Sequence, residues 1–383
     1  MSVVQPDMTS TIIDPALSEE HQLLGGGRAL PPLLFVSYEP TLAQNIGAER
    51  SKQIFNLIKV SGQSLYLIQD FSNSLTEVLA TLRRKDVDYK GVVIIGNYDV
   101  VPSRRLDTLP TSLRQALGSN VLGDTDNFTV WSDEAYGDID ENGSWGIPVS
   151  RIPDGKSSNV ILKALTATRP TSHQHKFGIR NSARPFAAGP YDLIPGTQQL
   201  LISEPAHSFG LGPKRAAASS VYVMLHGSDN DATRYWGEGA TGAMEALNLS
   251  NVPDDMAGIV FTGCCWAALP VNVKAVQWNP GMQISGRTAE TSIALAYLKA
   301  GSLAFIGCTG THYSPKLAPY NYYGGPMHTF FWTNYLAGQS PASALFTAKS
   351  QYLRGIPHGP NDDMSIAIEL KILRQYKCLG LGW

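Results

Sequence analysis

Short continuous apolar runs recur along this chain of 383 residues and constrain its fold more than any other feature. They read LLFVSY (Leu33–Tyr38), SLYLIQ (Ser64–Gln69), GVVIIG (Gly91–Gly96), VYVML (Val221–Leu225), GIVF (Gly258–Phe261) and SLAFIG (Ser302–Gly307). Runs this short, without alternation, are typical of strands that a parallel sheet buries on both faces. Helix-like segments lie between them, so the chain is predicted to be an α/β protein built from βαβ units.

The order of these segments divides the chain into three parts. Residues 1–30 lack periodicity, end near the glycines of Gly25–Gly27 and are predicted to be a tail or linker. Residues 31–170 form a smaller N-terminal α/β subdomain, and 171–383 form a second unit. In the second unit we expect helices at Arg287–Gly301 and at about Gly325–Ala337, Ala342–Arg354 and Asp362–Tyr376.

Composition excludes several classes of function. A net charge of −2 gives no electrostatic case for nucleic acid or an anionic membrane as a partner. No apolar run approaches the roughly 20 residues of a membrane helix, and the N-terminus does not read as a secretory signal. The four cysteines include no C-x-x-C pair, which favours a reducing compartment over a disulfide framework. We therefore expect a soluble, cytoplasmic protein, although a secreted form that had lost its leader would look the same.

Two of the apolar runs are followed by residues with reactive side chains. SVYVMLHG ends in His226 and Gly227, and GIVFTGCC ends in Cys264 and Cys265. In parallel sheets ligands bind beyond the carboxyl ends of strands, so the imidazole and a thiol can meet there if the strands are neighbours. The imidazole would take the thiol proton, and the N–H groups of Gly227 and Cys264 would stabilise an oxyanion. The alternative is that both residues are inert parts of the core.

This pattern resembles the signature of the caspase-like cysteine peptidases, in which His-Gly and Cys each follow a strand. Three further pieces resemble the gingipain branch in particular: GVVIIGNYDVVPS (Gly91–Ser103), SDEAYGDIDENGSWGIPVSRIPDG (Ser132–Gly155) and HGSDNDATRYWGEG (His226–Gly239). The likeness covers roughly three quarters of the chain. It implies a caspase-like fold, a mostly parallel sheet flanked by helices and preceded by a smaller α/β subdomain.

The resemblance also implies a cysteine endopeptidase that works through an acyl-thiol intermediate. His226 matches the catalytic histidine and Cys264 the nucleophile, while a one-residue bulge would make Cys265 the nucleophile instead. Where gingipains carry a glutamate that orients the histidine, this chain has Trp145 and Gly146. We therefore expect a dyad without a side-chain carboxylate, or with one from elsewhere.

The substrate pocket departs from the gingipain pattern as well. The acid of the gingipain arginine pocket falls near Ser157, so arginine specificity does not carry over. Asp154 is a candidate substitute. His312, in the loop after the run at Ser302–Gly307, is a second candidate for lining the pocket.

Asp138, Asp140 and Asn142, followed by Gly143, have the spacing of the first half of a calcium loop. Val149 stands where the loop's last, bidentate acid belongs, which favours a plain acidic turn. Gingipains bind calcium, so calcium remains the alternative, and no cofactor is required by the proposed chemistry.

Two hypotheses of function follow. The first is a cysteine endopeptidase that cleaves specific protein or peptide substrates, by analogy in a defence or cell-death pathway where a partner protein activates it. The second is a catalytically dormant caspase-like module that acts as a binding or scaffold protein. The missing glutamate keeps the second open.

Overall fold

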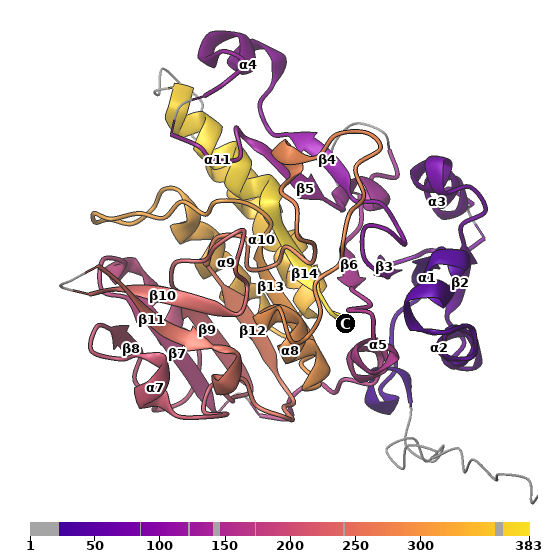
Figure 1. Ribbon diagram of the computed structural model, residues 1–383, viewed down its shortest axis with the longest axis horizontal. Coiled ribbons are helices and arrows are strands. Elements are labelled where there is room, and N and C mark those ends of the chain that lie inside the picture. Colours follow the sequence, from indigo (N-terminus) through magenta and orange to yellow (C-terminus); the bar gives the residue numbers. More distant parts are fainter. Residues whose placement is uncertain are drawn as a thin grey trace, which may run out of the picture.

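The computed structural model describes residues 23–383 apart from 85, 122, 141–145, 173, 240–241 and 357–362. A ten-stranded sheet with the order β2-β1-β3-β6-β14-β13-β12-β9-β7-β8 forms its centre (Figure 1). These strands are β1 (Leu33–Ser37), β2 (Ser64–Leu67), β3 (Gly91–Ile95), β6 (Val149–Ile152), β7 (Lys176–Asn181), β8 (Leu201–Ser203), β9 (Ser220–Met224), β12 (Ile259–Thr262), β13 (Ala304–Cys308) and β14 (Tyr376–Leu379).

The sheet consists of two blocks of parallel strands. In the first, β1 pairs with β2 and β3, and β3 pairs with β6. In the second, β12 pairs with β13 and β9, and β7 pairs with β8 and β9. The last strand, β14, lies between the blocks and runs antiparallel to β13. The predicted α/β class, with a mostly parallel sheet flanked by helices, is therefore confirmed.

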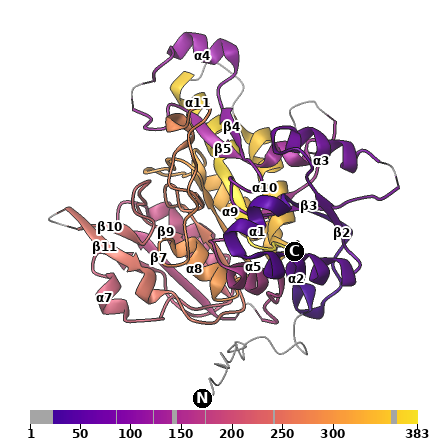
Figure 2. The same cartoon turned by 45° about the vertical axis from the view of Figure 1, so that its right-hand side comes forward.

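Helices cover both faces of the sheet. They are α1 (Glu39–Ile46), α2 (Ala48–Val60), α3 (Ser74–Leu82), α4 (Thr111–Leu117), α5 (Ser158–Leu165), α6 (Ala188–Asp192), α7 (Ser208–Leu211), α8 (Ile293–Lys299), α9 (Gly324–Leu336), α10 (Pro341–Gly355) and α11 (Asp363–Gln375). Successive strand residues point to opposite faces. Val223 of β9 thus packs with Ile293 of α8 in one apolar cluster, while Tyr222 belongs to another with Phe331 of α9. Figure 2 shows α1–α3 grouped at one end of the molecule.

Two small antiparallel sheets lie outside the main one. The first pairs β4 (Arg104–Asp107) with β5 (Thr129–Ser132), and the second pairs β10 (Arg234–Gly239) with β11 (Gly242–Asn248). Within the described residues, no helix is long and apolar enough to cross a membrane.

The three closing helices match the predicted ones closely, with two differences in this half of the chain. The helix expected at Arg287–Gly301 begins only at Ile293, because the Ser292 side chain caps it by accepting a hydrogen bond from the N–H of Leu295 at 3.5 Å. Tyr376, expected to end a helix, instead begins β14.

The predicted subdomain boundary stays a prediction, although in the main sheet β1, β2, β3 and β6 precede it and the other six strands follow it. Residues 1–22 of the predicted tail lie outside the described residues.

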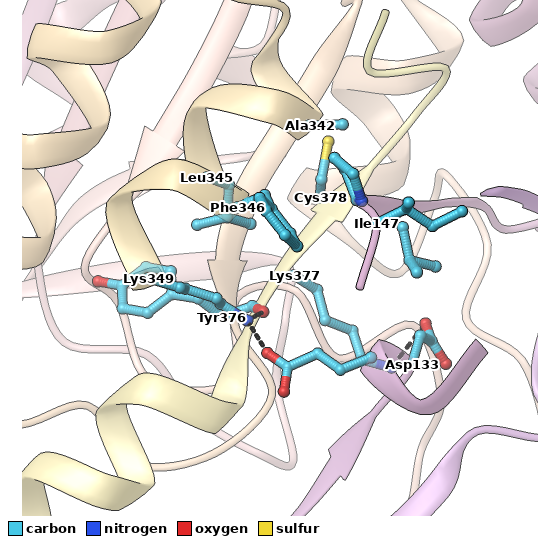
Figure 3. A pocket seen from close by; sticks show the side chains of 12 residues that line it. Asp133, Ile147, Ala342, Leu345, Phe346, Lys349, Tyr376, Lys377 and Cys378 are labelled. Atoms are coloured by element: carbon cyan, nitrogen blue, oxygen red, sulfur yellow. Dashed lines mark hydrogen bonds and ion pairs between the residues drawn. The ribbon is translucent and has the colours of Figure 1, made fainter. Parts of the chain in front are cut away.

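A buried ion network joins the two blocks of the sheet. Arg151 of β6 forms a bidentate pair with Asp133, with Nε–Oδ2 and Nη2–Oδ1 distances of 2.8 Å. Lys377 of β14 contacts the same carboxylate at 2.9 Å (Figure 3). Burial would raise the pKa of Asp133, but the two cations outweigh it and lower that pKa. The cavity beside this network, of about 40 Å³, is too small for more than a water or two.

Replacing Arg151 with Met tests how much the network stabilises the fold. The change keeps most of the volume but leaves Asp133 without its bidentate partner. Removing one member of a buried pair costs roughly 3–5 kcal/mol, and we expect a loss of that size in the free energy of unfolding, measured with urea. Lys52→Ala, which breaks the exposed pair with Glu49, is the control and should leave the free energy of unfolding close to that of the wild type. Equal losses in the two variants would contradict a structural role for the network.

Candidate active site

The two candidate reactive residues follow neighbouring strands. β9 and β12 pair in parallel, and partners such as Val223 and Thr262 are 39 positions apart in the sequence. His226 lies two residues beyond the end of β9 and Cys265 three residues beyond the end of β12, both at the carboxyl edge. Gly227, the neighbour of His226, packs against the backbone of Cys265, so the two loops meet there.

The two thiols differ in burial. Cys264 is fully buried in an apolar cluster, and its Sγ accepts a hydrogen bond from the N–H of Leu225 at 3.4 Å. Burial raises the pKa of the Cys264 thiol far above its usual range. Cys265 is only partly buried. This burial argues against Cys264 as the nucleophile, because a sealed thiol with a strongly raised pKa is not accessible to a substrate, and the choice between the two cysteines stays a prediction.

His226 is held by the β10–β11 hairpin. Its backbone forms two hydrogen bonds with Trp236 of β10, N to O at 2.7 Å and O to N at 2.9 Å. Two residues farther along β10, Glu238 places Oε1 3.1 Å from Nε2 of His226. The His226 side chain is 40% exposed, so the pair is open to solvent. If Nε2 carries the hydrogen that binds Glu238, the other ring nitrogen, Nδ1, is free to accept a proton.

Glu238 was not among the candidate residues. It answers the expectation of a carboxylate from elsewhere, because it follows the histidine in the chain whereas the gingipain glutamate precedes it. The sequence signal for the strand that carries Glu238 is the alternation in RYWGEG (Arg234–Gly239). This signal is weak because glycine occupies two of the six positions.

Gly227 lies against the backbone of Cys265. A Cβ atom at Gly227 would come within 2.1 Å of the carbonyl oxygen of Cys265 and 3.2 Å of its nitrogen, so only glycine fits. Burial raises the pKa of the Cys265 thiol, and hydrogen bonds from the N–H groups of His312 and Gly227 partly offset this rise. The distance from the His312 nitrogen to Sγ is 3.3 Å. Gly227 thus directs its N–H toward the sulfur of Cys265. The other predicted donor, the N–H of Cys264, belongs to the sealed residue.

A buried carboxylate, Asp126, holds together the segment that follows Cys265 and the loop that follows β13. Asp126 accepts hydrogen bonds from Nε1 of Trp266 at 3.0 Å and from the N–H of Thr311 at 2.6 Å. Lys371 of α11, which is fully buried, contacts Asp126 at 2.7 Å and Asp124 at 2.5 Å. The sequence did not point to these acids, because their partner follows them by more than 240 positions.

The two predicted pocket residues do not line an opening beside Cys265. The His312 side chain is buried, Nδ1 lies 3.7 Å from Sγ of Cys308, and burial lowers the pKa of the imidazole to about 3. Its backbone contacts Cys265 twice: the N–H donates to Sγ, and Sγ lies 3.9 Å from the carbonyl oxygen. Asp154 is also buried, and its carboxylate accepts hydrogen bonds from the N–H groups of Asn97 and Lys156, both at 2.8 Å. The burial of both side chains argues against their assignment to the pocket, which stays a prediction.

The calcium prediction stays a prediction. Asp138 and Asp140 are described, whereas Asn142 lies outside the described residues. In the part of the chain that the structure describes, no group of three His, Cys, Asp or Glu side chains could hold a metal ion.

Comparison with known proteins supports the fold. No family model and no curated protein matches the sequence. Among solved structures, the chain resembles the Arg-specific cysteine proteinase gingipain R, with a TM-score of 0.59 and 11% identity over 92% of this chain and 79% of that one. It also resembles a complex of the pro- and mature domains of RgpB from Porphyromonas gingivalis, with a TM-score of 0.56 and 12% identity over 91% and 78% of the two chains.

These likenesses confirm the expected gingipain-like, caspase-like fold. The first of these structures is a cysteine proteinase, and the second is a complex of a mature domain with a pro-domain. At such low identity the likeness extends to the fold alone.

Substituting Gly227 with Ala tests the close approach of the two loops. The new Cβ would collide with a backbone carbonyl, which cannot move as a side chain can, so one loop must shift. We expect a loss of about 1–3 kcal/mol in the free energy of unfolding, as in other overpacked sites. Gly355→Ala, where an added Cβ meets nothing within 4 Å, serves as the control and should be close to neutral. If Gly227→Ala is as stable as this control, the loops are not packed as described.

Proposed function

We propose that this chain is a cysteine endopeptidase in which Cys265 is the nucleophile and His226 the general base and acid. One observation supports it above all: the loop that carries His226, whose imidazole contacts a carboxylate, packs through Gly227 against the backbone of the partly buried Cys265. Cys264 becomes a small buried residue behind the nucleophile. Glu238 is a positioning residue, because it contacts the imidazole and not the reacting atoms.

The reaction begins with a protonated thiol, because burial raises the pKa of Cys265. As a peptide carbonyl approaches, Nδ1 of His226 takes the thiol proton and the sulfur forms a bond to the carbonyl carbon. The N–H groups of Gly227 and Cys265 then stabilise the oxyanion. The C–N bond breaks as the imidazolium protonates the leaving amine. Water, deprotonated by the same imidazole, hydrolyses the acyl-thiol and releases the second product.

A second candidate is the dormant binding module, and one observation favours it. The Gly227 N–H that the oxyanion needs is directed at the resting thiol, whose pKa is raised. A regulated enzyme would rest in this state until a partner releases the thiol, whereas a dormant module would remain in it. We accordingly include regulated cleavage of specific proteins, as in a defence or cell-death pathway, and a cytoplasmic location in the proposal.

A peptide library separates the two candidates. The wild type and Cys264→Ala should cleave members of the library, while Cys265→Ala and His226→Ala should lose at least about 10²-fold in rate, because each removes the nucleophile or its base. Cleavage sites are identified by mass spectrometry. Full activity in Cys265→Ala would overturn the assignment of the nucleophile. Absence of cleavage by the correctly folded wild type, with or without a cell lysate as a source of activator, would favour the dormant module.

Glu238→Gln tests the positioning role. A half-exposed ion pair contributes up to ~1 kcal/mol, so we expect kcat/KM to fall about five-fold, mainly through kcat. Glu238→Asp should give an intermediate value if contact with the imidazole is what matters. The matched control is Glu290→Gln, which removes an exposed carboxylate that pairs with Lys299 at 2.9 Å, and its kcat should not change. A change confined to KM would argue that Glu238 contacts the substrate instead.

A further inference from the structure

A second cavity, of about 1060 Å³, lies at the carboxyl edge of the first block of strands. Its walls include Asn45 of α1, which follows β1, and Tyr98 and Ser103, which follow β3. In this block β2 and β3 lie on opposite sides of β1, so the chain reverses its direction of winding between β1 and β3. Open parallel sheets bind ligands at such a switch point, in the crevice beyond the carboxyl ends.

The charges around this cavity favour an anion. Arg104, Arg105 and Lys156 line it, against one acid, Asp99, whose Oδ2 accepts a hydrogen bond from Asn45 at 3.0 Å. Arg104 and Lys156 are exposed, and within the described residues neither pairs with a carboxylate.

A buried ammonium group adds positive charge beneath the floor. Nζ of Lys377 donates to the hydroxyl groups of Tyr98 and Ser103, both at 2.8 Å, and both of these residues face the cavity. Lys377 shares its carboxylate, Asp133, with Arg151, and burial lowers the pKa of Lys377 to about 7, so its positive charge is partial near neutral pH. Charge-assisted hydrogen bonds from guanidinium groups are the usual means of holding phosphate.

Aromatic and amide side chains form the rest of the wall. Trp278 and Phe71 are partly exposed, and Trp278 packs edge-on against Trp131 with ring centroids 5.8 Å apart. Asn272 and Gln283 offer donors and acceptors. A cavity of this size encloses a molecule of a few hundred daltons. Cations at one part of the wall and flat apolar surfaces at another match a phosphate joined to a planar heterocycle.

The cavity is linked to the catalytic residues through the segment that follows Cys265. Residues 281–286 of this segment form one wall, and Ala275 accepts a hydrogen bond from Nε of Arg105 at 2.8 Å. The same segment contacts the loop after His226: Lys274 pairs with Asp229 at 2.9 Å, and Arg287 donates to the carbonyl oxygen of Asp229. A ligand that orders this segment therefore acts on both catalytic loops.

We propose that this cavity binds a nucleoside phosphate, and that the bound ligand regulates the site of Cys265 and His226. The regulatory half rests on the proposed function, whereas the binding half does not. Binding and reactivity are therefore measured separately.

Fluorescence anisotropy of N-methylanthraniloyl ATP and GTP measures binding to the full chain. We expect saturable binding to the wild type, and equally tight binding to Cys265→Ala, which has no nucleophile. The double change Arg104→Glu with Lys156→Glu should weaken binding at least about ten-fold, because it replaces two phosphate-binding cations with anions. Lys59→Glu, an exposed charge reversal at the end of α2 and at the opposite edge of the sheet, is the matched control and should bind as the wild type does.

Competition identifies which part of the ligand is recognised. Unlabelled ATP or GTP should displace the probe at lower concentration than inorganic triphosphate or the free nucleoside. Displacement by triphosphate at the same concentration would overturn recognition of the nucleoside. Non-saturable binding of both probes, or unchanged binding in the double variant with an unaltered melting temperature, would overturn the site altogether.

The rate at which iodoacetamide alkylates Cys265 then tests regulation without requiring peptidase activity. A nucleotide-dependent change of at least about two-fold in the wild type, absent from the double variant, would support the coupling. An identical rate with and without saturating nucleotide would contradict it and leave the peptidase proposal intact.

Discussion

The parallel pairing of β9 and β12 is the constraint on which the candidate site depends. Because Val223 pairs with Thr262, the residues that follow each strand determine which side chains meet at the edge of the sheet. A slip of one residue would turn the apolar side chains of each strand to the opposite face of the sheet. The apolar side chains of both strands pack against helices on both faces, and this packing makes such a slip costly.

Polar contacts then hold the loops beyond the strands. Loops that carry reactive groups need support from rigid elements, since a strand fixes only the residues it contains. Here Trp236 fixes the backbone of His226, and Asp126 joins the segments on either side of the thiol to α11 through Lys371. These supports are separated by long stretches of sequence, so the site exists only when both halves of the sheet have assembled.

Much of the fold could be predicted from the sequence because apolar runs and helix periodicity are local signals. The six predicted strands and the three closing helices all lie within a few residues of the observed elements. Strands with mixed composition, such as β6 with its buried Arg151, could not be found in this way, because their polar residues are paired with partners from other segments. β14 was missed because it continues directly from a helix.

The candidate site could be predicted only in part. Counting from the end of an apolar run favoured Cys264, since the sequence does not reveal how each chain turns after its strand. Glu238 escaped notice because it contacts His226 only through the fold of the β10–β11 hairpin. His312 was predicted to line the substrate pocket, whereas its imidazole is buried and its backbone contacts the Cys265 sulfur. Long-range pairing is therefore the information that the sequence alone lacked.

The most direct test is to measure the order in which the four thiols of the native protein react with iodoacetamide. Peptide mapping identifies which cysteine has been alkylated. Cys265 is the one partly buried cysteine, whereas Cys264, Cys308 and Cys378 are sealed in the core. The account predicts that Cys265 is alkylated first and that the other three react only on unfolding. Alkylation of Cys264 before Cys265 in the folded protein would contradict it.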